Sequence, residues 1–441
     1  MEGQTSGSSS KQQCLETTLR NELQNVKPPE MYGFDKQCIF RVPPAIRENN
    51  PKAYTPQMVS IGPFHKARDA GKEDSIFESM EELKENYLKA FLNRTQVPVG
   101  TFVDKLQKSE DKIRRCYAVH IKYKSDDFLK MILIDACFII EHFLRCHTNG
   151  DWRGKGPVLL KDSMQMQIWR DLILLENQLP FFVLKKLYKL AGINLASMNQ
   201  KSPSFLQISF DCLKHDLCGT RSCPTKSPKH FTDLMRTSLI SSSKFVLGEQ
   251  EECEGIKHVY SASQLREAGL KFKVSRNKNE CLLDMTYSDE GVLTMPILNI
   301  TDNSEVFFRN ILAFEECRHL SNDTNSITQY LVILNFLINT EKDVNVLVDN
   351  KIIVNWMGDA NKVATMVNNL DSNLAVPRFN SHYYSLCNSL NGFYENPRNK
   401  YKAIFIHEYF NTPWKIASTV AAIVLLLLTL IQTICSIISL F

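Results

Sequence analysis

Residues 125–147 read SDDFLKMILIDACFIIEHFLRCH. Apolar side chains recur there at steps of three and four residues, and the main stripe consists of Phe128, Ile132, Ala136, Ile139 and Phe143. The remaining positions are also mostly apolar, and a helix that is apolar on nearly every side is typical of a protein core. We therefore expect residues 125–147 to form a buried helix around which the neighbouring segments pack.

The segments on both sides of this helix have helical periodicity as well. Residues 75–91 alternate apolar and charged positions in the pattern of an amphipathic helix, and Pro180 is expected to break a helix over 163–178. Further helices are expected at 181–190, 205–213, 231–240, 261–268, 305–317, 328–339, 361–370 and 381–393. The chain is therefore predicted to be mainly helical.

Strand-like runs occur at residues 270–274, 280–287 and 291–300, with a hairpin turn expected at 288–291. They predict a small antiparallel meander, so the fold class is mainly α (α+β). Residues 38–42 also resemble a short strand, which Pro43 and Pro44 would end. Residues 54–63 are expected to be extended because Pro and Gly punctuate them.

Composition suggests a division of the chain into six parts. Residues 199–256 are rich in Ser, Lys, Cys and Pro and are interpreted as a variable linker or insertion with short helices. The expected parts are a flexible tail at 1–30, the first half of the body at 31–198, the linker at 199–256, the second half at 257–395, a basic neck at 396–415 and an anchor at 416–441.

Residues 416–441 contain no charged residue, Pro or Gly. As a helix this segment would be about 39 Å long, whereas roughly 20 apolar residues suffice to cross a bilayer. Trp414 and Lys415 precede Ile416 where an interfacial aromatic and a cation belong, and the segment runs to Phe441. A buried core helix is the alternative, but the sequence favours a C-terminal transmembrane helix and a lipid bilayer as its partner.

Arg398, Lys400, Lys402 and Lys415 lie before the predicted span. The positive-inside rule then predicts a cytoplasmic body with a tail anchor inserted after translation, and the plasma membrane is favoured over an endomembrane. The glycosylation sequons at Asn93, Asn299 and Asn322 are interpreted as chance matches. A glycan on any of them would invert this topology.

The overall composition narrows the function classes. The chain has 441 residues, a formal net charge of +4 and no long basic run, so no nucleic-acid partner is expected. Its 13 cysteines have no framework spacing, and residues 1–27 lack the apolar core of a signal peptide. We therefore expect free thiols in a reducing compartment, and no cofactor.

Cys212, His215, Cys218 and Cys223 form the densest cluster of potential metal ligands. These residue types could bind tetrahedral zinc, although a polar loop without metal is the favoured interpretation. Cys137, Glu141 and His142 could supply a Cys–His nucleophile, but an apolar helix favours a core cysteine instead.

Polar residues gather near the predicted end of the 163–178 helix. They could act as acid–base groups, but near a helix end such groups more often satisfy free backbone groups; they are Asp171, Glu176, Asn177 and Gln178. Asp135 and Glu141 are expected to pair with Arg or Lys of a neighbouring helix. The constrained segment with Arg41, Pro43, Pro44, Tyr54 and Gly62 could present a binding edge or fasten the N-terminus to the helices.

Several of these segments together resemble a plant family catalogued as domain of unknown function 247. The resemblance extends from about residue 36 to the end and is carried by IFRVPP at 39–44, AYTP at 53–56, VSIGPFH at 59–65, IDACFIIE at 134–141, DLILLENQLPFF at 171–182, SASQLREAG at 261–269, FRNILAFE at 308–315, NWMGD at 355–359 and NTPW at 411–414. It implies a plant membrane protein without an established enzymatic activity. Certain grass members of this family resemble self-incompatibility determinants.

No P-loop, dinucleotide-binding turn, nucleophile elbow or His-Glu-x-x-His motif occurs in the sequence. We therefore expect a membrane-tethered interaction or signalling component that binds an unknown protein partner and is not an enzyme. The alternatives are a membrane-associated enzyme of unknown chemistry, a zinc-stabilised scaffold and a recognition determinant of the self-incompatibility type.

Overall fold

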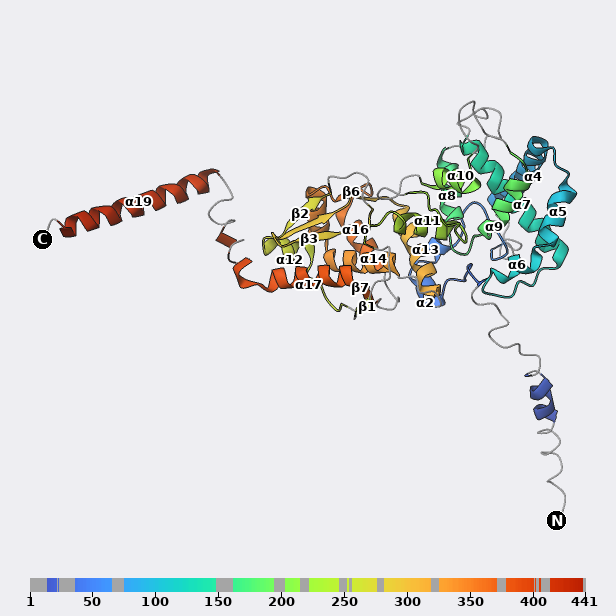
Figure 1. Ribbon diagram of the computed structural model, residues 1–441, viewed down its shortest axis with the longest axis horizontal. Coiled ribbons are helices and arrows are strands. Elements are labelled where there is room, and N and C mark those ends of the chain that lie inside the picture. Colours follow the sequence, from blue (N-terminus) through green and yellow to red (C-terminus); the bar gives the residue numbers. More distant parts are fainter. Residues whose placement is uncertain are drawn as a thin grey trace, which may run out of the picture.

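A computed structural model gives the arrangement of the chain. It describes residues 14–21, 23, 36–65, 75–147, 162–193, 203–214, 222–245, 252–253, 256–275, 281–318, 325–370, 378–399, 401, 404–405 and 413–438. The body is elongated, with the segments before α11 at one end and the small sheets at the other, and the C-terminal helix extends away from it (Figure 1).

The first half of the body is built around α7, Ser125–His147, as the apolar sequence predicts. Every side chain from Met131 to Leu144 is buried, and α4, α5, α9 and α10 pack against this helix (Figure 1). The helices of this half are α4 (Ser75–Thr95), α5 (Val99–Gln107), α6 (Glu110–Arg115), α7, α8 (Asp162–Leu172), α9 (Phe181–Leu190) and α10 (Phe205–Leu213). The short, polar helices α5 and α6 were not expected from the sequence.

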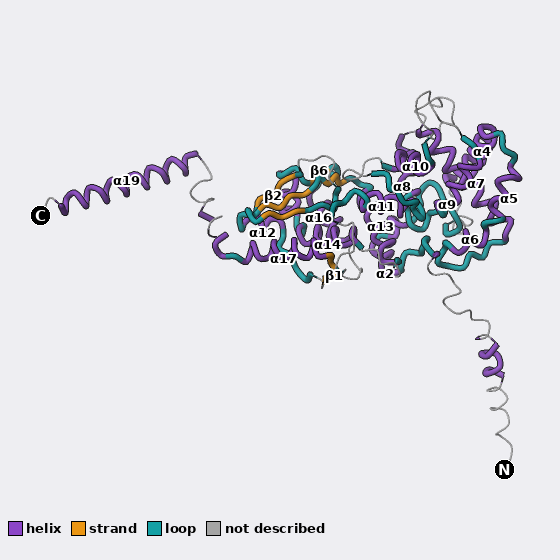
Figure 2. The backbone as a smooth tube through the Cα atoms, viewed as in Figure 1, coloured by secondary structure: helices purple, strands orange, loops and turns teal. Residues whose placement is uncertain are grey.

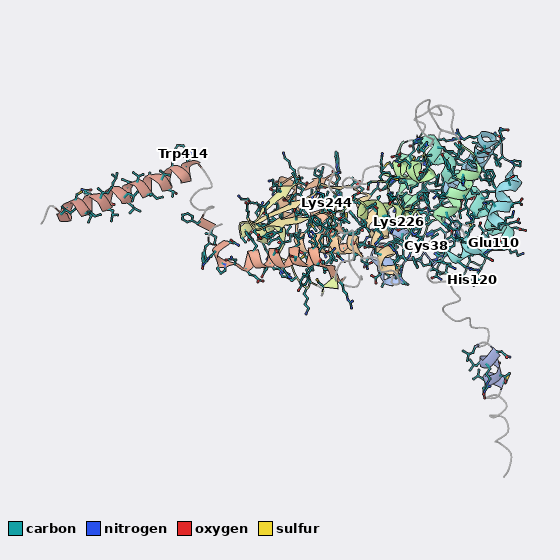
Figure 3. All side chains as sticks on the ribbon, viewed as in Figure 1. Cys38, Glu110, His120, Lys226, Lys244 and Trp414 are labelled. Carbon is teal, nitrogen blue, oxygen red and sulfur yellow. The ribbon has the colours of Figure 1, made fainter. Side chains whose placement is uncertain are left out.

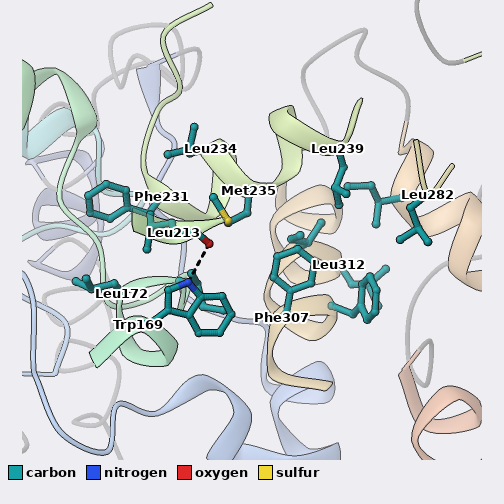
Figure 4. Close-up of a cluster of buried hydrophobic side chains, with 14 of the residues drawn as sticks. Trp169, Leu172, Leu213, Phe231, Leu234, Met235, Leu239, Leu282, Phe307 and Leu312 are labelled. Atoms are coloured by element: carbon teal, nitrogen blue, oxygen red, sulfur yellow. Dashed lines mark hydrogen bonds between the residues drawn. The ribbon is translucent and has the colours of Figure 1, made fainter. Parts of the chain in front are cut away.

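The segment interpreted as a linker carries two core helices, α10 and α11 (Phe231–Ile240). Figure 4 shows side chains of α11, among them Met235, in one buried cluster with Trp169 of α8 and Phe307 of α13 (Ser304–Cys317), so that α11 joins the two halves of the body. Trp169 Nε1 donates a hydrogen bond of 2.9 Å to the carbonyl of Leu213. Composition had suggested a separate insertion, but the few apolar residues of this stretch are the ones that are buried.

The second half combines helices with small sheets, of which the described residues contain three (Figure 2). Its helices are α12 (Ala262–Glu267), α14 (Ser326–Leu337), α15 (Glu341–Asp349), α16 (Ala360–Leu370) and α17 (Ser381–Glu395). The strands are β1 (Glu252–Cys253), β2 (Lys271–Val274), β3 (Thr286–Ser288), β4 (Val292–Met295), β5 (Leu298–Ile300), β6 (Ile353–Asn355) and β7 (Phe379–Asn380). Helix α15 was missed, although Thr340 and Asp343 form a capping box that marks its start.

The expected meander is only partly antiparallel. β3 and β4 form the predicted hairpin, but β2 lies on the other side of β4 and runs parallel to it, so the order is β2-β4-β3. The expected strand at 280–287 shortens to β3 because the side chains of residues 281–285 turn into the core. β5 pairs with β6 and β1 with β7.

The N-terminal part of the body lies across the helices. The strand expected at 38–42 reduces to a single parallel bridge between Ile39 and Tyr117. α2 (Pro44–Asn49) begins at Pro44, where a proline suits the first turn of a helix, and η3 (Pro51–Tyr54) follows. Tyr54 and Leu175 belong to a small apolar cluster that also contains Phe314 of α13.

The last helix, α19 (Pro413–Ile438), includes Trp414, Lys415 and Ile416, whereas Phe441 lies outside the described residues. Trp414 marks its end nearer the body (Figure 3). Residues Ala417–Ser436 have a mean hydropathy of 2.3 and none of this stretch is buried, so α19 is long and apolar enough to cross a membrane.

Candidate functional site

The most highly organised polar region surrounds residues 57–65, a segment without helix or strand that ends in a turn and whose amides pair with side chains. The amides of Gln57, Met58 and Val59 donate to the carboxylate of Asp171 over 2.6–3.1 Å. The amide of Ile61 donates to Asn177 Oδ1 over 2.6 Å. Buried amides need acceptors, and these side chains from α8 and its C-terminal connection supply them.

Gly62 lies at the closest approach of this segment to the helices. Its amide donates to Asp135 Oδ2 of α7 over 2.8 Å. Its φ is +71°, and a Cβ at this position would lie 2.7 Å from the carbonyl oxygen of Gln178. Both the left-handed backbone and the lack of space require glycine here.

The connection between α8 and α9 provides much of this arrangement. α8 ends at Leu172 and not at residue 178 as expected, because the amide side chains of Asn177 and Gln178 turn back to the chain. Asn177 donates to the carbonyls of Val59 and Asp171, and Gln178 donates to those of Leu172 and Leu174. The expected structural role of the polar residues at this helix end is confirmed.

Glu176 is the centre of a buried ion cluster. It accepts from the amide of Val42 at 2.7 Å, and its carboxylate lies 2.6 Å from Arg47 Nη2 and 3.3 Å from Arg41 Nη1. His65 Nε2 lies 3.4 Å from Oε2 of the same carboxylate. Only 1% of the Glu176 side chain is exposed, so these groups replace the water that a carboxylate would otherwise bind.

Asp135 and Lys84 form a second buried pair between α7 and α4. Lys84 Nζ donates to Asp135 Oδ1 at 2.9 Å, and it also contacts the carboxylate of Glu81 and the carbonyl of Ser60. Burial lowers the pKa of Lys84, but Asp135 and Glu81 outweigh it and raise this pKa above its ordinary value. The prediction that Asp135 pairs with a cation of a neighbouring helix is confirmed.

We call Lys84, Asp135, Asp171, Glu176 and Asn177 the polar clamp, since all five hold residues 41–65 against the helices. Burial raises the pKa of Asp171 to about 6, and the amides of Val59, Met58 and Gln57 oppose this shift. Such a pKa would suit acid–base chemistry, yet the Asp171 side chain is 0% exposed and its oxygens accept these amides. The polar clamp therefore orders the backbone of the N-terminal segment. It fastens this segment to the helices, which is one of the two roles proposed for Arg41–Gly62.

Glu141 and Glu315 are also paired with cations, as Glu176 and Asp135 are. Arg94 and Arg145 both donate to Glu141 at 2.9 Å, as expected for a buried carboxylate of α7. Glu315 of α13 accepts from Arg236 of α11 at 2.7 Å and from Thr328. The sequence did not predict which cations pair with these carboxylates, because the pattern of an amphipathic helix does not identify the partner of a charged residue.

The suggested Cys–His pair does not form between Cys137 and His142. His142 Nε2 instead lies 3.8 Å from Sγ of Cys146, and its ring stacks on Phe138. Cys137 is 0% exposed, and burial raises its pKa, which favours the neutral thiol.

The suggested zinc ligands fall partly outside the described residues, because His215 and Cys218 do. Cys212 Sγ donates to the carbonyl of Phe143 at 3.5 Å, and Cys223 Sγ lies 3.9 Å from that of Pro224. Within the part of the chain that the structure describes, no three His, Cys, Asp or Glu side chains are grouped to hold a metal ion. The four-ligand hypothesis therefore stays untested.

The prediction that the glycosylation sequons are chance matches also stays a prediction. Asn93 is exposed near the end of α4, Asn299 is half-buried in β5, and Asn322 lies outside the described residues.

Together, the fold and the clamp define a mainly helical protein with one long apolar C-terminal helix. The chain belongs to the family described as "Plant protein of unknown function" (DUF247), whose profile matches residues 39–428. It is 29% identical over 436 residues to the UPF0481 protein At3g47200 of Arabidopsis thaliana, covering 93% of this chain and 88% of the relative. It is 23% identical over 486 residues to the putative UPF0481 protein At3g02645 of Arabidopsis thaliana, covering 89% of each chain. No solved structure matches it.

Proposed function

We propose that the protein is a single-pass, membrane-tethered interaction component whose cytoplasmic body binds another protein and carries out no catalysis. The observation that carries this proposal is α19, because it is long and apolar and no residue of Ala417–Ser436 is buried against the body. An apolar helix of this length is stable in a bilayer, where each backbone group is satisfied within the helix. A body held at a membrane in this way encounters partners that are confined to the same surface.

The use of the buried ionisable groups also supports a binding role. Asp171, Glu176 and Asp135 lie in a polar region of the kind that could hold a substrate, but their partners are the chain's own amides and cations. These groups support the rigid presentation of the surface, and we assign them no chemistry on a ligand.

The turn after β6 is a suitable contact point for a partner protein. Trp356 there is 70% exposed, and its amide donates to the carbonyl of Ile300, which fixes the turn. Gly358 follows with a φ of +78°. Tryptophan contributes to protein interfaces more than most residues because it buries a large rigid surface.

Topology is the first property to test. The experiment uses the full chain with an N-terminal tag in sealed vesicles, and it combines protease digestion with glycosidase treatment. We expect the tag to be digested and the chain to show no mobility shift after glycosidase treatment. A protected tag with a glycan at Asn93, Asn299 or Asn322 would place the body in the lumen or outside the cell, and a cell-surface recognition role would replace the proposed one.

The contact point is tested by photo-crosslinking in the native membrane. A benzophenone amino acid at Trp356 should give a discrete crosslinked product, whereas the same group at Lys89 should not. Lys89 is an exposed position on α4, at the other end of the body (Figure 1). Equal labelling at the two positions, or none at either, would contradict a specific contact at the turn after β6.

A further inference from the structure

Two cysteines far apart in the sequence, Cys38 and Cys116, lie directly beside each other. The next residues in the chain, Ile39 and Tyr117, form a parallel bridge, and the amides of Cys38 and Ile39 both donate to the carbonyl of Cys116 at 2.9 Å. Neighbouring strands are about 4.8 Å apart. This spacing lies within the range of roughly 4.4–6.8 Å between Cα atoms that a disulfide requires.

Both thiols are reduced in this structure, since neither sulfur is in a disulfide. The Cys116 thiol donates to the carbonyl of Lys112 at 3.3 Å. Because the backbone spacing already suits a disulfide, the backbone pairing needs no rearrangement before a bond between the sulfurs can form. Ala118, whose amide donates to the carbonyl of Ile39, holds the other side of the bridge in place.

The surroundings shift the pKa values of the two thiols in opposite directions. The neighbouring Cys38 thiol lowers the pKa of Cys116, and the cations of Lys112 and Lys229 lower it further, although burial opposes them. The neighbouring Cys116 thiol, together with burial, raises the pKa of Cys38. A thiolate beside a protonated partner thiol is the arrangement that reacts with oxidants.

Access to this pair differs from that of the other core cysteines. Cys38 is 6% and Cys116 7% exposed, whereas Cys137 and Cys281 are 0% exposed. The pair thus lies nearer the protein surface than these two cysteines do. A second thiol pair, Cys146 and Cys212, provides a comparison: Cys212 Sγ donates to the carbonyl of Phe143 at 3.5 Å, and Cys146 Sγ lies 3.8 Å from His142 Nε2.

We propose that Cys38 and Cys116 form an oxidation site at which a peroxide converts the dithiol to a disulfide. The Cys116 thiolate attacks one peroxide oxygen, which gives a sulfenic acid and releases hydroxide. The Cys38 sulfur then attacks the sulfenic sulfur and displaces the hydroxyl group, which leaves as water with the Cys38 thiol proton. The hydroxide of the first step becomes the other water when it takes up the proton that the Cys116 thiol had lost. The two sulfurs lose two electrons in total, and hydrogen peroxide is reduced to two molecules of water.

The disulfide would join the N-terminal segment covalently to the connection between α6 and α7. That segment continues into Arg41 and Val42, which contact Glu176 of the polar clamp. Oxidation would thus fix residues 38–42 on the helices, whereas the reduced chain holds them through hydrogen bonds and ion pairs alone. The inference is independent of the identity of any partner protein.

The test is made on the full-length reduced protein in detergent micelles with stoichiometric hydrogen peroxide. Free thiols are then alkylated under denaturing conditions, and the peptides are analysed by mass spectrometry. We expect a Cys38–Cys116 crosslinked peptide to form first, with Cys146 and Cys212 still alkylated. Recovery of Cys38 and Cys116 as alkylated thiols, or earlier formation of a Cys146–Cys212 disulfide, would overturn the proposal.

The electrostatic part of the proposal is tested through Lys112, which lies one turn before Cys116 on α6. Lys112→Gln should slow formation of the crosslink several-fold, and Lys112→Arg should retain the rate because the charge is kept. Lys186→Gln is the matched control: both lysines lie over the ring of Phe182, at 4.6 Å and 5.3 Å, but Lys186 does not act on Cys116. An equal rate in Lys112→Gln and Lys186→Gln would contradict activation by Lys112.

Discussion

Glu176 shows how a single buried carboxylate orders a distant segment. Its partners, Val42, Arg47, Arg41 and His65, come from the segment that precedes α4, whereas Glu176 lies between α8 and α9. Removing the charge leaves the largely buried Arg47 without its counterion, whereas the Arg41 side chain is 41% exposed. For the buried Glu176–Arg47 pair, the cost of this loss exceeds what the ion pair contributes on its own.

We expect Glu176→Gln to lower the free energy of unfolding by about 3–5 kcal/mol, the usual cost of breaking a buried pair. The measurement is chemical denaturation of the full chain in detergent. Glu78→Gln serves as the control because Glu78 is exposed on α4, where substitutions usually change stability by less than about 0.5 kcal/mol. Similar effects of the two substitutions would rule out a central role of the Glu176 cluster.

Asp171 should make stability depend on pH. Its pKa of about 6 in the folded protein lies above the ordinary value of 3.8, so the folded state holds the proton more tightly than the unfolded chain does. This contribution is fully present below about pH 4 and is lost as the pH rises through 6.

Relative to Asp171→Asn, which cannot titrate, the wild-type chain should lose about 3 kcal/mol of stability between pH 4 and pH 7, at 1.36 kcal/mol per pKa unit. Unfolding curves of both proteins across this range provide the measurement. Asp127→Asn, at an exposed position of α7, should run parallel to the wild type. A wild-type stability that rises over the same range relative to Asp171→Asn would mean that the amide donors outweigh burial.

At the scale of elements, α7 is central because helices from several parts of the chain pack against it. The Phe143 ring lies 5.4 Å from Phe231 of α11 and 6.3 Å from Phe205 of α10. These contacts make α10 and α11 part of the core, even though the composition of residues 199–256 resembles that of a linker.

Phe143→Ala and Phe231→Ala should therefore each destabilise the body by about 3–5 kcal/mol through loss of burial and the cavity left behind. In the double variant the two effects should differ from their sum by about 0.5–1.5 kcal/mol, the coupling of a packed aromatic pair. Val119→Ala, at a side chain that is 40% exposed, is the control. If Phe231→Ala were as mild as Val119→Ala, α11 would not be a core helix.

At the scale of the whole molecule, the anchor and the body are expected to be energetically separate. No part of residues Ala417–Ser436 is buried, so α19 adds nothing to the core of the body. Its apolar surface is instead what makes the molecule depend on a bilayer or detergent.

A chain that ends before Pro413 should thus leave the membrane fraction and keep the thermal unfolding midpoint of the full chain. Leu425→Arg, near the middle of α19, provides a milder test in the full chain. It should reduce membrane insertion, since an arginine at the centre of a span costs about 2.5–3.5 kcal/mol. A large fall in the midpoint of the truncated body would indicate that α19 packs on it.

Local periodicity was sufficient to predict the elements whose type is determined by their own residues. α7, α10, α11 and α19 were predicted close to their observed bounds because an apolar pattern at helical spacing indicates both the helix and its surroundings. The hairpin from β3 to β4 followed from its turn residues in the same way. The family could also be recognised from the sequence, because its motifs extend over most of the chain.

Tertiary structure alone decided where non-local partners meet. The parallel pairing of β2 with β4, the end of α8 at Leu172 and the partners of Glu176 all depend on contacts between distant segments. The juxtaposition of Cys38 and Cys116 depends on such contacts as well, since these residues are brought together by one bridge between segments that are far apart in the sequence. A sequence pattern specifies which face of an element is buried, but the partner of a buried polar group is specified only by the packing of the whole chain.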